Sequence, residues 1–342
     1  MARKYPDRFA PADEPDDVGF TTATAARDGG EDLFEDLEDE LEDLDGHRIS
    51  TWGGSGAGKS TFLAALSRAA LTATGDSSGW TVAPVDEPSA TYLATAAASL
   101  QQRAFPMPSQ RREIYRFALL RRAQADGTGV VRAELRVTDG SGDDTAMSDM
   151  ALAGDVDEML ASDGFLFLFD PTLPAKGKSN SETLDPLVVF LKQRAEETQT
   201  WVDARLPHYV AVCVTKFDNE EVFRRSLRGG WVNQDPDTRM PCVRPVDAAK
   251  YVAWMCAELG ETSVHETIQG DFHPDRIRFF VSSAIGFHQT PRQGFDSHAG
   301  NPFNYDRQPG RAPRIRGAIH PINVLEPVVW LQDRLRQHGE RF

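Results

Sequence analysis

One short stretch of the sequence constrains the possible folds more than any other, Gly53-Gly54-Ser55-Gly56-Ala57-Gly58-Lys59-Ser60-Thr61. It fits the phosphate-binding pattern G-x-x-x-x-G-K-[ST], known as a P-loop. Glycines allow several backbone N–H groups to turn inward toward phosphate oxygens, and a Cβ atom there would block that approach. In such a loop Lys59 meets the β- and γ-phosphates, and the hydroxyl of Ser60 can bind Mg²⁺. The residues expected to contact a nucleotide here are Gly53, Gly56, Gly58, Lys59, Ser60 and Thr61.

The sequence around this stretch has the pattern of a strand, a loop and a helix. Residues 47–52 are expected to form the first strand, and the apolar run that begins at Phe62 is expected to form a helix as far as about Leu71. The positive N-terminal end of that helix would face the phosphates. The pattern predicts a three-layer α/β fold of the P-loop NTPase type. Its mostly parallel sheet would have one antiparallel edge hairpin and helices on both faces.

The charge of the chain is concentrated near its N-terminus. The 342 residues carry a net charge of −15, and residues 1–46 hold 16 acidic and 4 basic side chains of that total. The rest of the chain is nearly neutral, so a nucleic-acid-binding surface is not expected. Residues 1–46 are predicted to be a disordered acidic arm. Within it, residues 31–45 contain ten carboxylates and a helical spacing of Phe34, Leu37, Leu41 and Leu44. This segment reads either as a solvated tail or as a helix that a partner, or the protein's own surface, orders.

The cysteines and the apolar runs indicate a cytoplasmic protein without a membrane span. Three cysteines without metal-ligand spacing (Cys213, Cys242 and Cys256) favour a reducing compartment. The longest strongly apolar run, residues 165–169, is too short to cross a bilayer. Residues 1–6 lack the apolar core of a signal peptide.

A second candidate motif follows a predicted hairpin. Residues 115–120 and 131–137 read as its two strands, and residues 80–85 as a short edge strand beside them. The second hairpin strand runs into Thr138-Asp139-Gly140-Ser141-Gly142. An Asp delivered beside a P-loop can hold Mg²⁺, usually through water, and a Gly at the position of Gly142 can sense the γ-phosphate. The alternative is a simple D-G turn. Asp170, after the most apolar strand, is a rival for the Mg²⁺ site, but Pro171 follows it where ATPases of that layout usually have Glu.

Two further strands end in polar motifs. Residues 208–214 precede Thr215-Lys216-Phe217-Asp218, and residues 278–281 precede Ser282-Ser283-Ala284. Helices are expected over residues 90–103, 184–197 and 247–259, and from Asn323, where Asn323 and Glu326 fit a capping box. The buried stripe of the last helix would be Val324, Val328, Leu331 and Leu335. Residues 220–245 and 286–319 read as irregular loops or insertions within a single domain of residues 47–342.

The order of these motifs resembles the Ras-like (TRAFAC-class) P-loop GTPases across roughly residues 47–336. The resemblance implies that Thr215, Lys216 and Asp218 read guanine. Asp218 would accept hydrogen bonds from N1–H and N2–H₂ together, the stem of Lys216 would pack over the ring, and the backbone N–H of Ala284, after Ser283, would bind O6. A closer likeness is to the bacterial double-GTPase proteins associated with conflict systems. This likeness depends on the segment from Thr51-Trp52-Gly53 to Leu63 and on residues 321–327.

The resemblance implies a Mg²⁺-dependent GTP- and GDP-binding switch, with two departures. The only nearby hydroxyl for the first switch is Ser109, and Asp143 stands where the water-orienting Gln usually lies. Hydrolysis of GTP to GDP and phosphate is therefore expected to be slow, with a protein partner, an activator or a second GTPase-like subunit, supplying what is missing. Arg111 and Arg112 are the nearest arginines that could reach in. The alternatives are a P-loop ATPase and a nucleotide-binding scaffold that recruits partners through its acidic arm.

Overall fold

A seven-stranded sheet forms the centre of the molecule. The computed structural model describes residues 47–73, 78–107, 113–121, 131–139, 161–289, 295, 301–307 and 310–338. The strand order is β2-β3-β4-β1-β5-β6-β9. The strands are β1 (His47–Trp52), β2 (Trp80–Pro84), β3 (Glu113–Arg121), β4 (Val131–Asp139), β5 (Gly164–Phe169), β6 (Tyr209–Val214) and β9 (Ile277–Val281). All neighbouring pairs from β4 to β9 are parallel, whereas β3 is antiparallel to both β2 and β4. The sheet is thus mostly parallel, with the predicted β3–β4 hairpin and the predicted edge strand β2 at one side.

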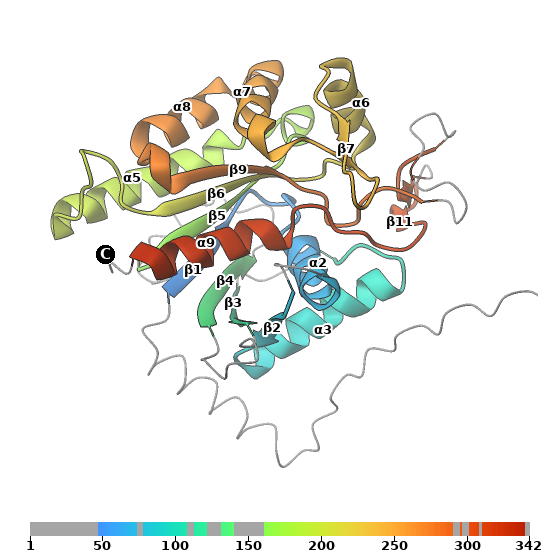
Figure 1. Ribbon diagram of the computed structural model, residues 1–342, viewed down its shortest axis with the longest axis horizontal. Coiled ribbons are helices and arrows are strands. Elements are labelled where there is room, and N and C mark those ends of the chain that lie inside the picture. Colours follow the sequence, from blue (N-terminus) through green and yellow to red (C-terminus); the bar gives the residue numbers. More distant parts are fainter. Residues whose placement is uncertain are drawn as a thin grey trace, which may run out of the picture.

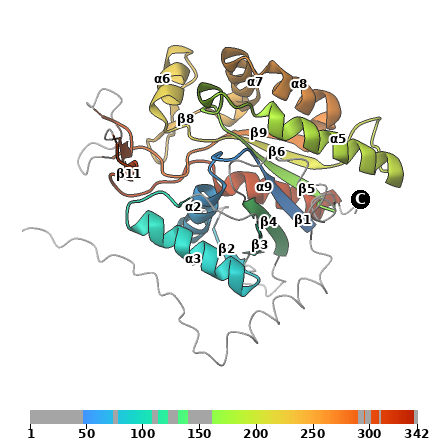
Figure 2. The ribbon, with the colours of Figure 1, turned by 180° about the vertical axis from the view of Figure 1, so that it is seen from behind.

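Helices cover both faces of this sheet (Figures 1 and 2). One face carries α2 (Lys59–Thr72), α3 (Glu87–Gln101) and α9 (Leu325–His338). The opposite face carries α5 (Ser181–Thr198), α7 (Ala248–Leu259) and α8 (Thr262–Asp271), with α6 (Glu220–Arg228) beyond them. The short 3-10 helices are η2 (Pro174–Lys176), η3 (Pro245–Asp247) and η4 (Pro274–Arg276). This is the three-layer α/β fold that the sequence predicts.

The core lies on both sides of the central strands. Every residue of β5 and β6 is buried. In β5, Leu166 and Leu168 pack into the cluster with α2 and α9, while Phe165, Phe167 and Phe169 pack into the cluster with α5 and α7. A continuous apolar run is expected of a parallel strand that is covered on both faces. The predicted stripe of the last helix, Val324, Val328, Leu331 and Leu335, is also buried.

The middle of the second hairpin strand, residues 133–137, is buried on both faces. Ala133, Leu135 and Val137 face the apolar core, as their alternation predicts. The intervening Glu134 and Arg136 are buried as well, because Glu134 accepts from Arg136 at 3.0 Å and from Arg116 on β3 at 2.7 Å. The alternating pattern alone would leave this second face of β4 to solvent. Ion pairs of Glu134 with Arg136 on the same strand and with Arg116 on β3 fill it instead.

Residues 220–228 are helical, so the prediction of an irregular stretch over residues 220–245 is wrong at its start. The side chain of Asn219 accepts a hydrogen bond from the backbone N–H of Glu221 and caps α6. Val222, Phe223 and Ser226 form its buried side. Most other residues of this helix are charged, which hides its short apolar periodicity. The rest of the stretch contains only the small hairpin of β7 (Asn233–Gln234) and β8 (Pro241–Cys242).

The predicted capping box at the last helix is also wrong, because α9 begins at Leu325 and Asn323 lies outside it. Asn323 adopts a left-handed backbone conformation with φ 47°. Its side-chain amide donates to the carbonyl of Val281 at 2.9 Å, so it ties the chain to the end of β9. The carboxylate of Glu326 instead interacts with backbone N–H groups at the start of the helix.

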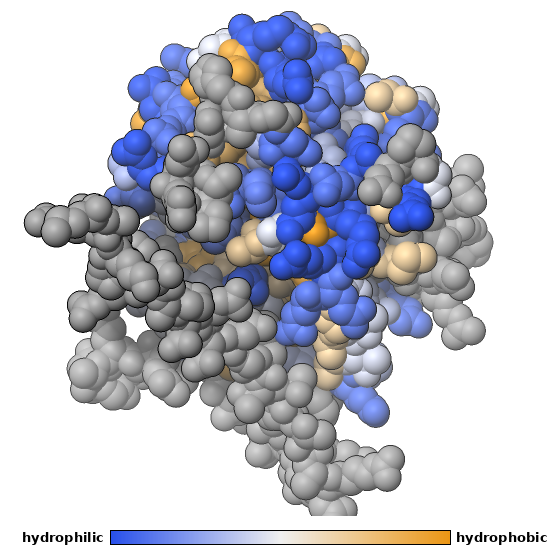
Figure 3. Space-filling model, turned by 90° about the vertical axis from the view of Figure 1, so that its right-hand side faces the viewer, coloured by the Kyte–Doolittle hydropathy of each residue, from blue (hydrophilic) through white to orange (hydrophobic). Residues whose placement is uncertain are grey.

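The described part of the stretch 286–319 is packed onto the body of the protein. Tyr305–Asp306 (β10) and Arg314–Ile315 (β11) form an antiparallel pair. Gly286 has φ +66°, and a Cβ there would collide with the backbone oxygen of His320, so the chain leaving β9 and the chain returning to α9 approach each other closely. On the face seen in Figure 3, the described residues are mainly hydrophilic, and apolar residues occupy small separate areas.

Among the described helices, none combines the length and the apolar character that a bilayer span requires. Several sequence predictions fall outside the described residues. They concern the arm of residues 1–46, Ser109, Arg111, Arg112, Gly142 and Asp143.

Candidate functional site

The P-loop follows β1, the strand at which the chain passes from one half of the sheet to the other. Residues 53–58 join β1 to α2, and β1 is flanked on one side by β4 and on the other by β5. The helix after β1 (α2) and the helix after its neighbour β5 (α5) lie on opposite faces of the sheet (Figure 1), and between such strands a crevice opens at their carboxyl ends. Gly58 has φ 97°, a left-handed conformation that starts α2. The amino group of Lys59 donates to the carbonyl of Gly53 at 2.9 Å and so bends back over the loop.

The loop after β6 is attached directly to the P-loop. The hydroxyl of Thr215 donates to the carbonyl of Ala57 at 3.1 Å. The amino group of Lys216 donates to the carbonyl of Gly56 at 2.5 Å, and its backbone is left-handed with φ 56°. This backbone conformation is uncommon for a residue other than glycine. Two motifs that are far apart in the sequence thus form one continuous surface.

Asp170 holds Lys216 from the other side. One carboxylate oxygen of Asp170 lies 2.6 Å from the amino group of Lys216, and the other accepts from the backbone and the hydroxyl of Thr172, each at 2.8 Å. Asp170 is fully buried. The side chain of Asn180 accepts from its backbone N–H at 2.8 Å and donates to Glu261 at 2.5 Å. Both oxygens of this rival candidate for Mg²⁺ are therefore engaged within the protein.

Asp218 lies where the loops after β6 and β9 meet. Its carboxylate accepts a hydrogen bond from the hydroxyl of Ser283. That hydroxyl also accepts from the backbone N–H of Gly286 at 2.8 Å. Asp218 is buried, and burial raises its pKa to about 6, although the hydrogen bond from Ser283 and the charge of Lys216 oppose the shift.

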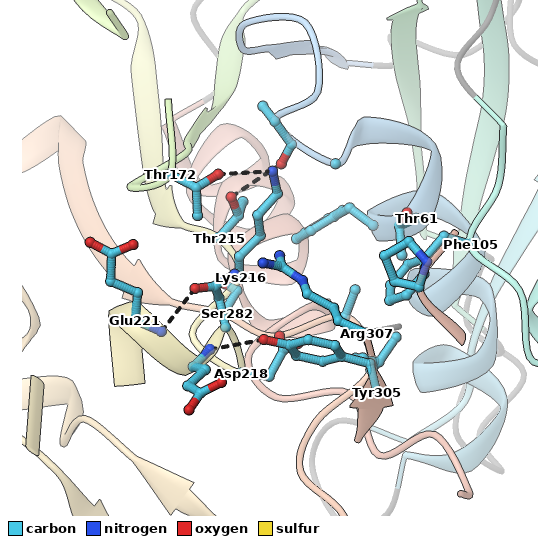
Figure 4. A pocket seen from close by; sticks show the side chains of 18 of the residues that line it. Thr61, Phe105, Thr172, Thr215, Lys216, Asp218, Glu221, Ser282, Tyr305 and Arg307 are labelled. Atoms are coloured by element: carbon cyan, nitrogen blue, oxygen red, sulfur yellow. Dashed lines mark hydrogen bonds between the residues drawn. The ribbon is translucent and has the colours of Figure 1, made fainter. Parts of the chain in front are cut away.

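These loops line a cavity of about 490 Å³, which is large enough for a nucleotide (Figure 4). Six of the residues singled out in the sequence line it, namely Gly58, Thr61, Thr215, Lys216, Asp218 and Ala284. Gly53, Gly56, Lys59, Ser60 and Ser283 belong to the same loops or to the first turn of α2. The backbone of Asp139 ends β4 on the side of β1 away from β5, and Gly142 lies outside the described residues.

Four further lining residues come from places that carry no recognisable motif. Phe105 follows α3, Lys176 lies in η2, and Tyr305 and Arg307 belong to the segment after β9. The pKa of Lys176 is lowered by its burial and, to a smaller extent, by the nearby cations Lys216 and Arg307. The described lining of the cavity thus contains three basic residues, Lys176, Lys216 and Arg307, together with three acidic ones, Asp218, Glu220 and Glu221.

The oxygen ligands expected for Mg²⁺ fit that ion by their chemistry. Mg²⁺ prefers oxygen donors, and it usually keeps several waters and binds one or two protein groups together with substrate phosphates. Helix α2 begins directly after the left-handed Gly58, and Ser60 is its second residue. Asp139 is the last residue of β4, the parallel neighbour of β1. The backbone thus brings residues 60 and 139 to the two elements next to the P-loop.

Comparisons with known proteins give little beyond this geometry. No protein-family model matches the sequence, and no curated protein matches it. Among solved structures, the chain is similar to the signal recognition particle receptor SRb-GTP/SRX complex from Chaetomium thermophilum, with 15% sequence identity and a TM-score of 0.34. The match covers 70% of this chain and 91% of that chain. At this level of similarity, the function of the chain has to be inferred from its own site.

Proposed function

We propose that the chain is a Mg²⁺-dependent guanine-nucleotide-binding protein that hydrolyses GTP slowly and acts as a partner-regulated switch. The observation that carries the proposal is the chain of contacts from Gly56 through Lys216 to the loop that holds Asp218. This arrangement places a P-loop at one end of a cavity and a buried carboxylate at the other. A nucleoside triphosphate needs a site for its phosphates and a site for its base within one cavity.

The buried carboxylate favours guanine over adenine. Guanine presents two neighbouring donors, N1–H and N2–H₂, which one carboxylate can accept together, whereas adenine offers no such pair. With adenine in the cavity, Asp218 would be left buried without these partners, and that costs about 1–3 kcal/mol or more. Ser283 fixes one of its oxygens, and the N–H of Ala284 is available for the O6 oxygen of guanine.

The phosphates would be held by the other end of the cavity. The backbone N–H groups of residues 53–61 and the ammonium of Lys59 would bind the β- and γ-phosphates. Ser60 and Asp139 would hold Mg²⁺, which supplies neutralisation of the charge on the transferring phosphoryl group when it is bound. Lys176 would add a further positive charge near the cavity.

The test of this proposal is a titration of the purified protein with labelled GTP, GDP and ATP, with and without Mg²⁺. We expect tighter binding of GTP and GDP than of ATP. Lys59→Ala should weaken GTP binding at least tenfold, which corresponds to about 1.4 kcal/mol, while Lys250→Ala, an exposed lysine on α7, should leave it unchanged. Equal affinity for ATP and GTP would exclude guanine recognition, and full binding by the Lys59 variant would exclude the P-loop as the site.

Hydrolysis and the partner belong to the same proposal. Unassisted small GTPases turn over at about 10⁻³ s⁻¹ or below, and Asp143 replaces the Gln that orients water in them. We expect a turnover in this range for the isolated chain and a faster one when an activator or a second GTPase-like subunit, as in bacterial double-GTPase proteins, is added. A turnover near 1 s⁻¹ from the isolated chain would contradict the switch function.

A further inference from the structure

One wall of the cavity is formed by a segment that belongs to none of the nucleotide-binding motifs. It consists of residues 301–307 and 310–316, between β9 and α9, and we refer to it as the β9–α9 wall. Asn304, which is fully buried, fastens it to the body of the protein. The side chain of Asn304 donates to the carbonyls of Ile285 at 3.0 Å and Ala318 at 2.8 Å and accepts from the N–H of Gly317 at 2.9 Å. The wall is therefore a built part of the site.

Tyr305 attaches this wall to the loop that carries Asp218. The hydroxyl of Tyr305 accepts a hydrogen bond from the backbone N–H of Glu220 at 3.0 Å, two residues after Asp218. The guanidinium of Arg307 lies 5.4 Å from the centre of the Tyr305 ring. In Figure 4, the side chain of Arg307 extends from beside Tyr305 into the cavity and toward Lys216. Arg307 thus enters the cavity from the end where Asp218 lies.

The opposite side of this space is formed by Lys216. Its amino group is held by Gly56 and Asp170, so its aliphatic stem lines the cavity in a fixed position. A planar ring whose edge meets Asp218 would lie between this stem and the guanidinium of Arg307. A guanidinium is planar and weakly hydrated, and it stacks well on aromatic faces.

We propose that Arg307 stacks on the purine ring and, with Tyr305, forms a base clamp that the β9–α9 wall supplies from within the chain. This inference deepens the proposed function and depends on it. The ligand class is a guanine nucleotide, and the contribution of Arg307 is to its base rather than to its phosphates. The affinity that Arg307 adds is therefore independent of the number of phosphates.

The experiment compares the parent protein with Arg307→Ala, Arg307→Lys and the control Arg314→Ala, in equilibrium titrations with labelled GMP, GDP and GTP. Arg314 is an exposed arginine of β11 in the same wall that does not line the cavity. We expect Arg307→Ala to weaken all three ligands by a similar factor of about ten, in the range of a cation–π contact. Lysine should restore only part of the loss because it lacks the plane, and Arg314→Ala should have no effect.

The outcomes separate this inference from the proposed function. If the parent prefers GTP to ATP and Arg307→Ala binds GMP, GDP and GTP as tightly as the parent, the base clamp alone is overturned. The base clamp is also overturned if the loss of affinity in Arg307→Ala grows from GMP to GTP and Arg307→Lys restores it. Arg307 would then act as a positive charge on the phosphates. A parent that binds no guanine nucleotide overturns both. Thermal melting of each variant, which should match the parent because both arginines are exposed, confirms that the fold is intact.

Discussion

The side chain of Lys216 is fixed by two loops at once. Its amino group contacts the carbonyl of Gly56 and the carboxylate of Asp170, although it remains partly accessible. A lysine on a flexible four-carbon stem loses rotamer freedom when it is held in this way, and two charge-assisted hydrogen bonds offset that loss. The stem is therefore in place before a base arrives.

Asp170→Asn tests this arrangement at the scale of single residues. The substitution keeps the shape of the side chain but removes the charge that holds Lys216. We expect the free energy of unfolding to fall by roughly 1–3 kcal/mol and GTP affinity to fall several-fold. Denaturant unfolding and nucleotide titration measure the two effects. Asp203→Asn, at a largely exposed carboxylate, serves as the control. An Asp170→Asn protein with parental GTP affinity would show that Lys216 does not need this partner.

The pKa of Asp218 predicts a pH dependence of binding. Burial raises this pKa to about 6, against the hydrogen bond from Ser283 and the charge of Lys216. Only the ionised carboxylate can accept two N–H groups of guanine. Affinity for labelled GDP should therefore be constant above about pH 7 and fall as the pH drops through 6, by up to about tenfold per unit. Asp218→Asn should bind weakly and lack this dependence.

The same group has the opposite effect on stability. Because the folded-state pKa lies above the unfolded value, the ionised carboxylate disfavours the folded state above about pH 6, and protonation relieves this between about 6 and 4. The contribution of Asp218 to the free energy of unfolding thus rises as the pH falls, while nucleotide affinity declines. If melting temperatures of the parent and of Asp218→Asn change in parallel over this range, Asp218 does not titrate there.

Several of the predicted residues that line the cavity are ones whose position follows from a strand end. Lys216, Asp218 and Ala284 come directly after buried parallel strands, and parallel strands deliver their carboxyl ends to one edge. Arg307 and Tyr305 could not be found in this way. They reach the cavity through the packing of an insertion that has no apolar periodicity, and nothing in their immediate sequence specifies that packing.

At the scale of elements, predictability follows the strength of the local pattern. The strands β5 and β6 and the buried side of α9 are long, uniform patterns, and the structure confirms them. The helix α6 was missed because most of its nine residues are charged and its cap, Asn219, lies in a polar stretch. The expected cap of α9 failed because Asn323 uses its side chain for a contact with Val281, a contact between segments that no local pattern reveals.

Leu331→Ala tests the packing of α9 against the sheet. Leu331 is fully buried on α9, which contacts β1, β5 and β6. This helix lies on the opposite face of the sheet from α5 (Figure 1). Removal of its side chain should lower the free energy of unfolding by about 2–5 kcal/mol, measured by denaturant unfolding. Val329→Ala, at a half-buried position of the same helix, should cost clearly less. Equal losses for the two variants would mean that the helix does not bury the predicted stripe.

At the scale of the whole molecule, nearly all of the net charge belongs to the arm. A chain that starts at residue 46 should keep its nucleotide affinity within about threefold, or 0.7 kcal/mol, because the described residues that line the cavity all lie between residues 57 and 313. It should also lose binding to a basic partner, since ten carboxylates within residues 31–45 are removed. Titration with labelled GDP and pull-down with a basic peptide measure the two effects. A large change in affinity would instead indicate that the arm packs against the site.

Two segments that line the cavity from distant parts of the chain are joined to each other. The N–H of Ile315 donates to the carbonyl of Arg103 at 2.9 Å, and Ala104 forms a bridge with Arg314, so the β9–α9 wall pairs with the segment that leads to Phe105. A nucleotide bound as proposed would lie in a cavity that both Phe105 and Arg307 line. A displacement of one of these segments would therefore be passed to the other through their backbone pairing. Under the proposed function, a factor that hastens nucleotide exchange is expected to act where residues 103–104 meet residues 314–315.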